Sequence, residues 1–306
     1  MAKNDSKMKS EETKKKLENY PELQENEKRF IRVPKKIIFD GEYEYDKYND
    51  VVCDESGEPI WNSLGLGKRR LGVFLFLFCK MSYDMEIFIS LKLLCRWLHK
   101  ELNTHKTSAV TQDLIRLFGE YEKMGFVDIG EEVKTTKIID GKINKSKLDD
   151  MCNGKDRFAI LYIDEIKKIL NYDGEVQLDK IYVLLVFAYF RLVIPCQGDF
   201  YGAAEIAEAF DIHYRQIEDE LKLSERVISN AVAILIELGI LYERRRSPMI
   251  KYFYEGNKKI KKHIPRTSIF CNVYKRKDGR LIGYGEDYYE EEIKKKIEIL
   301  NREGYR

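Results

Sequence analysis

The stretch from Leu221 to Tyr252 constrains the fold of this chain more than any other. Residues 216–221 (QIEDEL) predict a short helix, and after a tight turn residues 224–238 (SERVISNAVAILIEL) predict a second one. Ser224 suits an N-cap, because its hydroxyl can accept a hydrogen bond from the free N–H groups of the first turn. Gly239 follows where a left-handed C-cap is expected. The stretch therefore predicts two helices joined by a tight turn.

A strand and a basic turn are predicted after the second helix. Ile240 to Tyr242 begins a strand, residues 243–248 (ERRRSP) form the turn, and Met249 to Tyr254 (MIKYFY) returns as a second strand. Helix, turn, helix and basic hairpin in this order resemble a winged helix. In that family the second helix enters the major groove of DNA and the hairpin, or wing, meets the backbone.

The second helix has two chemically different faces. Apolar residues recur at three- and four-residue spacing and predict a buried face: Val227, Ala231, Ile234, Leu235 and Leu238. Asparagine can pair with adenine and arginine with guanine through two hydrogen bonds, and each pair discriminates by roughly 1–3 kcal/mol. The opposite face carries such chemistry, and its predicted DNA contacts are Arg226, Ser229 and Asn230. The alternative is a polar face that only meets solvent.

Positive charge is concentrated near the end of the chain. The whole sequence is 35% charged and balances to +2, but residues 244–280 hold 13 Lys or Arg against 2 acids. Such a segment predicts a surface that faces a polyanion, and the alternative is a solvated Lys-rich surface. The predicted DNA contacts are Arg244, Arg245, Arg246 and Lys251 on the wing, and Lys258, Lys259, Lys261 and Lys262 on a basic loop.

The two halves of the chain repeat one pattern. An extended segment opens each half, at Phe30 and at Phe158. The first long helices are offset by 111 residues (Lys68 and Asp179), and the glycines that end the third helices by 114 (Gly125 and Gly239). The pattern predicts a mainly α chain with small β-hairpin wings, built as two tandem winged-helix (helix-turn-helix) domains. The expected parts are a disordered tail (1–28), domain 1 (29–150), domain 2 (157–285) and a charged C-terminal helix (286–306).

The first domain has its own candidate contacts. On the exposed side of its third helix we expect four polar residues, which are Ser108, Thr111, Gln112 and Arg116. Asp140-Gly141 predicts the turn of its hairpin. This domain either binds DNA or mediates dimerisation.

No catalytic or metal-binding set occurs in the sequence. The segment Gly65-Leu66-Gly67-Lys68 lacks the first glycine and the Ser or Thr of a phosphate-binding loop, since Asn62 and Arg69 stand there. The four histidines and six cysteines have no metal-ligand spacing. We therefore expect no catalytic residue, metal or cofactor, and no enzyme activity.

The cellular compartment is predicted from features that the sequence lacks. The cysteines are expected to be free thiols of a reducing compartment. The N-terminus does not resemble a signal peptide. The longest apolar run, residues 183–194, contains Arg191 and is too short to span a bilayer. The predicted location is the cytoplasm, without membrane contact.

The arrangement over about residues 30 to 285 resembles the replication initiators of plasmids and other mobile elements. The segment Phe30-Ile31-Arg32-Val33-Pro34, leading into a first helix, is similar to the opening of their N-terminal domains. The resemblance implies sequence-specific binding of double-stranded DNA at an origin, with replisome proteins or a second copy as further partners. The alternatives are a transcription regulator with the same surfaces and a winged-helix protein-interaction scaffold.

Overall fold

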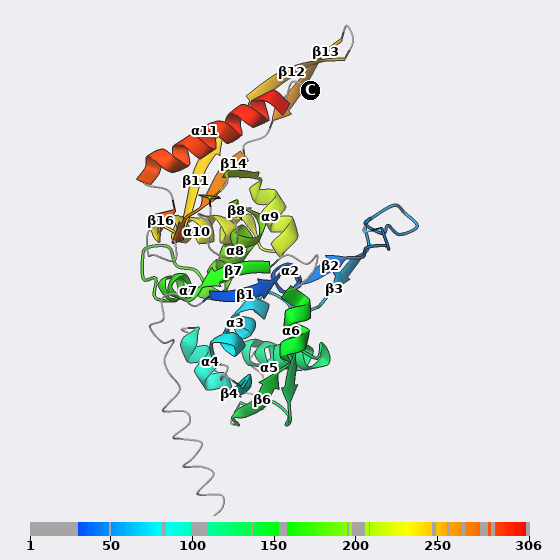
Figure 1. Cartoon of the computed structure of the whole chain (residues 1–306), viewed down its shortest axis with the longest axis vertical. Coiled ribbons are helices and arrows are strands. Elements are labelled where there is room, and N and C mark those ends of the chain that lie inside the picture. Colours follow the sequence, from blue (N-terminus) through cyan, green and yellow to red (C-terminus); the bar gives the residue numbers. More distant parts are fainter. Residues whose placement is uncertain are drawn as a thin grey trace, which may run out of the picture.

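The structure is a computed structural model that describes residues 30–48, 50–80, 84–98, 109–135, 137–152, 158–194, 196–197, 206–207, 209–246, 249–255, 258–264, 267–275, 281–282 and 285–303. The predicted tail, residues 1–28, lies outside these ranges. The molecule is elongated, with the first half of the chain towards one end and the second half towards the other (Figure 1).

Short strands and helices alternate through the first half. In chain order they are β1 (Phe30–Pro34), α2 (Lys35–Phe39), β2 (Gly41–Tyr43), β3 (Trp61–Ser63), α3 (Arg70–Lys80), β4 (Glu86–Ile89), α4 (Leu91–Trp97), α5 (Ala109–Lys123), β5 (Val127–Ile129), β6 (Ile139–Ile143) and α6 (Lys145–Cys152). Strands β2 and β3 form an arm that projects from the body (Figure 1).

The second half begins with the same kinds of element. They are β7 (Phe158–Tyr162), α7 (Ile163–Leu170), α8 (Lys180–Val193), β8 (Cys196–Gln197), β9 (Ile206–Ala207), β10 (Ala209–Ile212), α9 (Tyr214–Leu221), α10 (Glu225–Glu237), β11 (Leu241–Arg246), β12 (Met249–Glu255), β13 (Lys258–Ile264), β14 (Thr267–Asn272), β15 (Tyr274–Lys275), β16 (Leu281–Ile282) and α11 (Gly285–Glu303).

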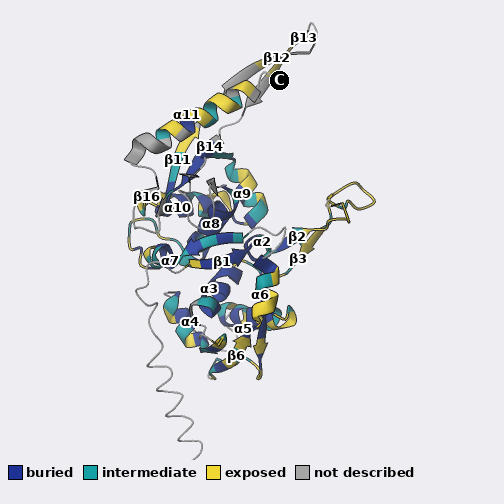
Figure 2. Cartoon of the chain, in the orientation of Figure 1, coloured by how far each residue is buried: buried dark blue, intermediate teal, exposed yellow. Residues whose placement is uncertain are grey.

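Helix α8 lies in the middle of the core (Figure 2). Its sequence, KIYVLLVFAYFRLV, is apolar on every side, and every residue from 183 to 192 is buried. A helix of this kind is stable only when other elements surround it. Helices α3, α7 and α10 and strand β7 do so. Buried apolar side chains from both halves therefore form one continuous cluster, from Ile31 to Phe270.

Strands β1 and β7 join the two halves directly. They pair antiparallel, with Phe30 opposite Tyr162 and Pro34 opposite Phe158. Each strand opens its own half of the chain and leads at once into a helix, α2 or α7. The sequence predicts extended segments over residues 30–39 and 158–163. This is confirmed for β1 and β7, which are each other's partners, but residues 35–39 and Ile163 lie in helices.

A three-stranded antiparallel sheet recurs in each half. The strand orders are β4-β6-β5 and β10-β14-β11, so in both sheets the strand that comes last in the chain lies in the centre. The two halves thus share one sheet order, and the duplication of a domain stays a prediction. The halves differ because the second one inserts the hairpin β12–β13 between β11 and β14.

The predicted fold class is wrong. The chain is a mixed α/β protein with small antiparallel sheets, not a mainly α protein made of two tandem winged-helix domains. Strands β4 and β10 are short and pair with distant strands, so local patterns do not reveal them. Residues 203–210 even predict a helix, whereas their described part lies in β9 and β10.

Two predicted strand pairings are also wrong. Residues 249–254 do not return along β11, because β12 pairs with β13 while β11 pairs with β14. Asp140-Gly141 is not a turn but the middle of β6, where Gly141 lies opposite Ile87 and Ile129. A Cβ on Gly141 would meet the carbonyl oxygen of Asp128 at 2.7 Å. This glycine therefore permits a close strand approach.

Helix α11 packs on its own chain. In the sequence, Ile293, Ile297 and Leu300 form a narrow apolar stripe on this charged helix, which predicts such packing. Ile293 is fully buried together with Ile269 and Cys271, and Ile297 and Leu300 pack against the same cluster. The helix thereby covers the sheet β10-β14-β11 (Figure 1).

A buried ion pair lies at the end of α8. Arg191 donates to Glu165 of α7 at 2.6 Å and to the carbonyl oxygen of Val273 at 2.7 Å. The two side chains are only 0% and 7% exposed. Neither charge is stable in such surroundings without its partner.

Replacing Arg191 with methionine should lower the free energy of unfolding by about 3–5 kcal/mol, because it leaves the Glu165 carboxylate buried without a counter-charge. Urea unfolding measures the loss. The double variant Arg191→Met, Glu165→Met should recover most of it. The control is Lys168→Met, exposed on α7. A loss for Arg191→Met no larger than for this control would contradict the prediction.

Candidate nucleic-acid interface

Helices α9 and α10 meet at a tight turn. Helix α9 ends at Leu221. Lys222 follows it with a φ of 56°, in the left-handed region, and the extended Ser224 precedes α10. Ile217 and Leu221 of α9 and Leu223 of the turn are buried. The turn thereby holds α9 and α10 together as a helix pair.

Helix α10 presents its polar face outward. Ile228, Ala231, Val232, Ile234 and Leu235 are buried. On the other side Arg226 is exposed, while Ser229 and Asn230 are half-buried. The predicted placement of these three residues on one accessible face is correct, and their contact with DNA stays a prediction.

The three wing arginines do not lie at a hairpin tip. The sequence predicts a basic turn over residues 243–248, but Arg244, Arg245 and Arg246 lie in strand β11, opposite residues of β14. Arg244 forms an ion pair with Glu290 of α11. Arg245 lies 3.4 Å from Glu243. Two of the three predicted phosphate contacts therefore already have an acidic neighbour.

Glu243 connects helix α9 to the sheet. Its side chain is only 5% exposed, and its Oε1 accepts hydrogen bonds from Tyr214 at 2.9 Å and from Ser268 at 2.6 Å. Burial raises the pKa of Tyr214, and the neighbouring carboxylate of Glu243 raises it further. The phenol therefore stays protonated and keeps donating, which fixes the start of α9 against β11 and β14.

The lysines after residue 256 lie on a strand and not on a loop. Lys258, Lys259, Lys261 and Lys262 belong to β13, and Lys251 of β12 lies opposite Lys262. The hairpin β12–β13 projects beyond the body (Figure 1). The sequence did contain a signal for it, since Gly256-Asn257 between two strand-like runs is typical of a hairpin turn.

One face of this hairpin combines an aromatic ring with positive charge. Tyr252 and Lys261 are directly opposite each other, and such pairs share a face. The Lys259 Nζ lies 4.2 Å from the centre of the Tyr252 ring. All three side chains are exposed, as are Lys258 and Ile260.

The candidate contacts of the first half are placed differently. Ser108 lies outside the described residues. Thr111 is only 1% exposed, so its predicted place on the exposed side of the helix is wrong. The helix is rotated so that Thr111 joins Leu114 and Phe118 on the buried face. Gln112 is exposed, as predicted.

Arg116 holds a loop in place. Its guanidinium donates to the carbonyl oxygens of Gly65 at 2.5 Å and Leu66 at 2.9 Å, and to Asp113 at 2.7 Å. Asp40 accepts from the N–H groups of Leu66 and Gly67 in the same loop. Arg116 is thus committed to contacts within the chain.

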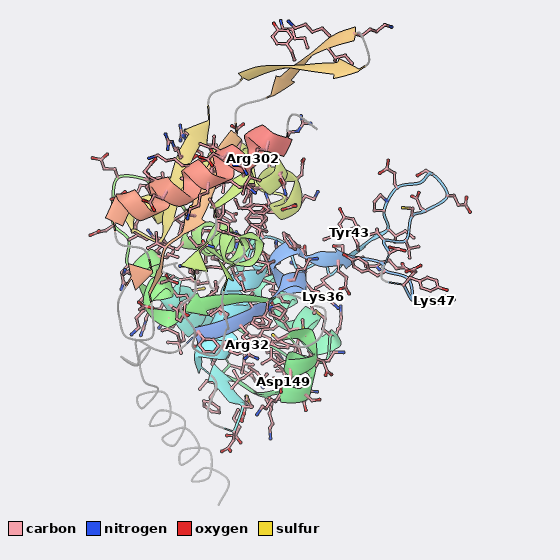
Figure 3. All side chains as sticks on the ribbon, turned by 45° about the horizontal axis from the view of Figure 1, so that its top comes forward. Arg32, Lys36, Tyr43, Lys47, Asp149 and Arg302 are labelled. Carbon is pink, nitrogen blue, oxygen red and sulfur yellow. The ribbon has the colours of Figure 1, made fainter. Side chains whose placement is uncertain are left out.

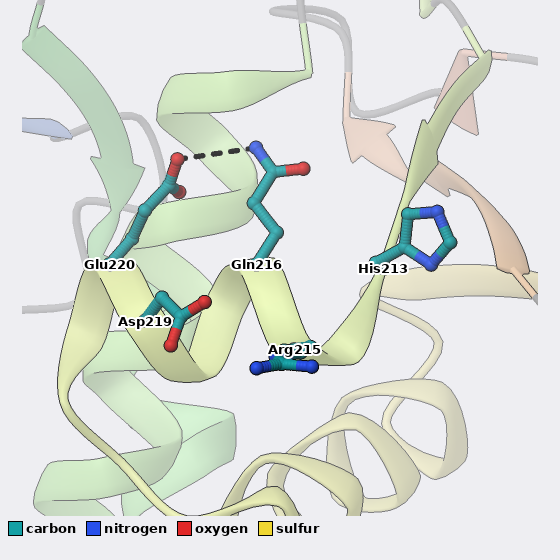
Figure 4. A pocket seen from close by; sticks show the side chains of 5 residues that line it. All are labelled: His213, Arg215, Gln216, Asp219 and Glu220. Carbon is teal, nitrogen blue, oxygen red and sulfur yellow. Dashed lines mark hydrogen bonds between the residues drawn. The ribbon is translucent and has the colours of Figure 1, made fainter.

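A depression lies along α9 (Figure 4). The side chains that line it are His213, Arg215, Gln216, Asp219 and Glu220, and Gln216 donates to Glu220 at 3.2 Å. No serine, threonine or cysteine is among them. In the described ranges no group of three His, Cys, Asp or Glu could hold a metal ion. The expectation that the chain is not an enzyme stays a prediction.

Comparison with known proteins adds no relative. No protein-family model matches the sequence, and no curated protein matches it either. Among the helices that the structure describes, none is both long and apolar enough to cross a membrane.

Replacing Arg116 with alanine should lower the free energy of unfolding by about 1–3 kcal/mol, because it leaves carbonyl groups of the 65–66 loop without a donor. The same variant should bind duplex DNA as the parent protein does. Lys123→Ala, exposed on the same helix, is the control for stability. Unchanged stability with reduced affinity for DNA would instead make Arg116 a DNA contact.

Proposed function

We propose that the chain binds double-stranded DNA through its second half. The observation that carries this proposal is the projecting hairpin β12–β13, with Lys258, Lys259 and Lys261 all exposed. Phosphate contacts from lysine provide most of the affinity of proteins for DNA, and they need a cationic surface that can reach the backbone. A two-stranded β-ribbon such as β12–β13 also fits the major groove of DNA.

The polar face of α10 is the proposed reader of sequence. An α-helix fits the major groove, and base edges there present different patterns for each base pair. Asn230 and Arg226 lie on the accessible face of α10 and carry the groups that recognise adenine and guanine. In this proposal the hairpin supplies affinity and α10 supplies specificity.

The second half is favoured over the first by the gathering of its lysines on one projecting element. In the first half, Arg116 is engaged with the 65–66 loop. Lys134 and Lys137, near its sheet, form ion pairs with Glu132 and Glu131. Its exposed lysines Lys142, Lys145 and Lys147 are divided between β6 and α6, whereas Lys258, Lys259 and Lys261 lie together on β13.

For the biological role we propose replication initiation at the origin of a plasmid or mobile element. The support is the sheet order that the two halves share, together with the resemblance of the opening segment. Regulation of transcription would use the same residues. Direct repeats at an origin as the bound site favour initiation, whereas an inverted repeat over a promoter favours regulation.

Replacing Lys258, Lys259 and Lys261 together with alanine should weaken binding to random duplex DNA and make it less dependent on salt. If each lysine neutralises one phosphate, the slope of log affinity against log salt should fall in magnitude by about 2–3. Fluorescence anisotropy over a series of salt concentrations measures both quantities.

The matched control removes three exposed lysines elsewhere, Lys92, Lys123 and Lys168. It should leave the slope of the parent protein unchanged. An equal effect of both triple variants would show that only net charge matters. Negligible binding of the parent protein at low salt would remove the DNA proposal and favour a protein-interaction scaffold.

Replacing Asn230 with alanine should relax specificity at one position of the preferred site, by about 1–3 kcal/mol between the best and second-best base. Selection from a random duplex library gives the site, and competition binding gives the discrimination. Affinity for non-specific DNA serves as the internal control and should stay the same. Equal discrimination in both proteins would exclude Asn230 from base reading.

A further inference from the structure

Residues 41–48 and 50–63 form a two-stranded arm, and among the residues that the structure describes no third strand pairs with it. Gly41 lies opposite Ser63 and Tyr43 opposite Trp61, and bridges at Tyr45↔Val51 continue the pairing outward. Asp46 accepts from the N–H groups of Tyr48 and Asp50, which closes one tip loop. Asp54 accepts from Ser56 and Glu58 and closes the second. The arm is therefore a formed element whose edges stay open.

Large apolar side chains are exposed along this arm. It holds five of the ten exposed large hydrophobic residues of the described chain, which are Tyr43, Tyr45, Tyr48, Val51 and Trp61. Tyr48 is 73% exposed. Figure 3 shows Tyr43 near the base of the arm and Lys47 farther out, with side chains extending into solvent. Exposed aromatic groups gathered on one element are typical of protein-binding surfaces.

The charge of the arm selects the kind of partner. Lys47 is its single base, and its exposed acids are Glu44, Asp46, Asp50, Asp54, Glu55 and Glu58. A hydrogen bond from Ser56 lowers the pKa of Asp54. Such a surface repels DNA, anionic membranes and a second arm of the same kind. It fits a basic protein surface with aromatic groups of its own.

The hairpin β12–β13 has the complementary properties. It is also two-stranded and projecting, and it presents lysines beside an exposed tyrosine. Both elements already place a lysine over a tyrosine ring, Lys47 over Tyr48 at 4.8 Å and Lys259 over Tyr252 at 4.2 Å. Lysines of one element can form the same contact with tyrosines of the other. In Figures 1 and 3 the two elements project from separate parts of the chain.

We propose that the acidic aromatic arm of one molecule docks on the β12–β13 hairpin of a second copy of this chain. Opposite charge guides the encounter and burial of tyrosine and tryptophan holds it. The contact uses the lysines proposed to bind DNA, so self-association and DNA binding compete. The docking itself does not depend on the DNA proposal.

The test reverses the charge of the arm or of the hairpin in the full-length chain. Sedimentation velocity at low salt, without DNA, then measures self-association. The arm variant carries Asp50→Lys, Glu55→Lys and Glu58→Lys, which spares the loop-closing Asp46 and Asp54. The hairpin variant carries Lys258→Glu, Lys259→Glu and Lys261→Glu. Each variant alone should associate about tenfold more weakly than the parent protein or not at all, whereas their mixture should associate again. Circular dichroism confirms that both variants stay folded.

Three outcomes would overturn the proposal: a parent protein that stays monomeric at low salt, an arm variant that associates like the parent, or a mixture that does not associate. Anisotropy with duplex DNA on the same proteins separates the two proposals. The arm variant should keep DNA binding and the hairpin variant should lose it. A parent protein that binds DNA but does not self-associate therefore contradicts the docking alone.

Discussion

The burial of α8 is the constraint on which the rest of this structure depends. The helix is apolar on every side, so it needs neighbours all round. Strand β7 and helices α7 and α10 from the second half supply some of them, and α2 and α3 from the first half supply others. The pairing of β1 with β7 then brings the two repeats together. Even the one charged residue buried in the helix, Arg191, is matched by a buried partner from α7. As a result one core supports all the proposed binding surfaces, which are α10 and the β12–β13 hairpin for DNA and the arm for a second copy.

Local sequence patterns predict the longer helices of this chain but not its strand pairing. Helices α3, α5, α8 and α10 lie where apolar spacing places them, because a helix is specified by neighbours three and four residues away. The predicted capping bond of Ser224 is absent, although this residue does precede α10. Strand pairing depends on distant segments. The centre of the second sheet is β14, and its partner β11 is separated from it by the whole hairpin β12–β13. Local sequence also fails to place Gly141. The dipeptide Asp140-Gly141 is typical of a turn, but here it lies within β6, where Gly141 allows a neighbouring strand to approach closely.

The candidate site was predictable to a similar degree. The accessible face of α10 follows from helical spacing, and the structure places Arg226, Ser229 and Asn230 on it. The arginines of β11 were misplaced, because Glu290, the acid beside Arg244, comes from a helix much farther along the chain. The position of Thr111 was predicted wrongly because a polar residue near one end of a helix can be buried as well as exposed. Charge is also segregated by element, with an acidic arm at one place and a basic hairpin at another, which the near-neutral total conceals.

The proposal that α10 and the β12–β13 hairpin grip DNA together can be tested by amide hydrogen exchange of the full chain with and without duplex DNA. The account predicts slower exchange in peptides covering residues 225–237 and 249–264 when DNA is bound. Peptides from the arm, residues 41–63, should exchange as before or faster. Protection confined to the arm or to the first half, or no protection at concentrations where DNA is bound, would contradict it.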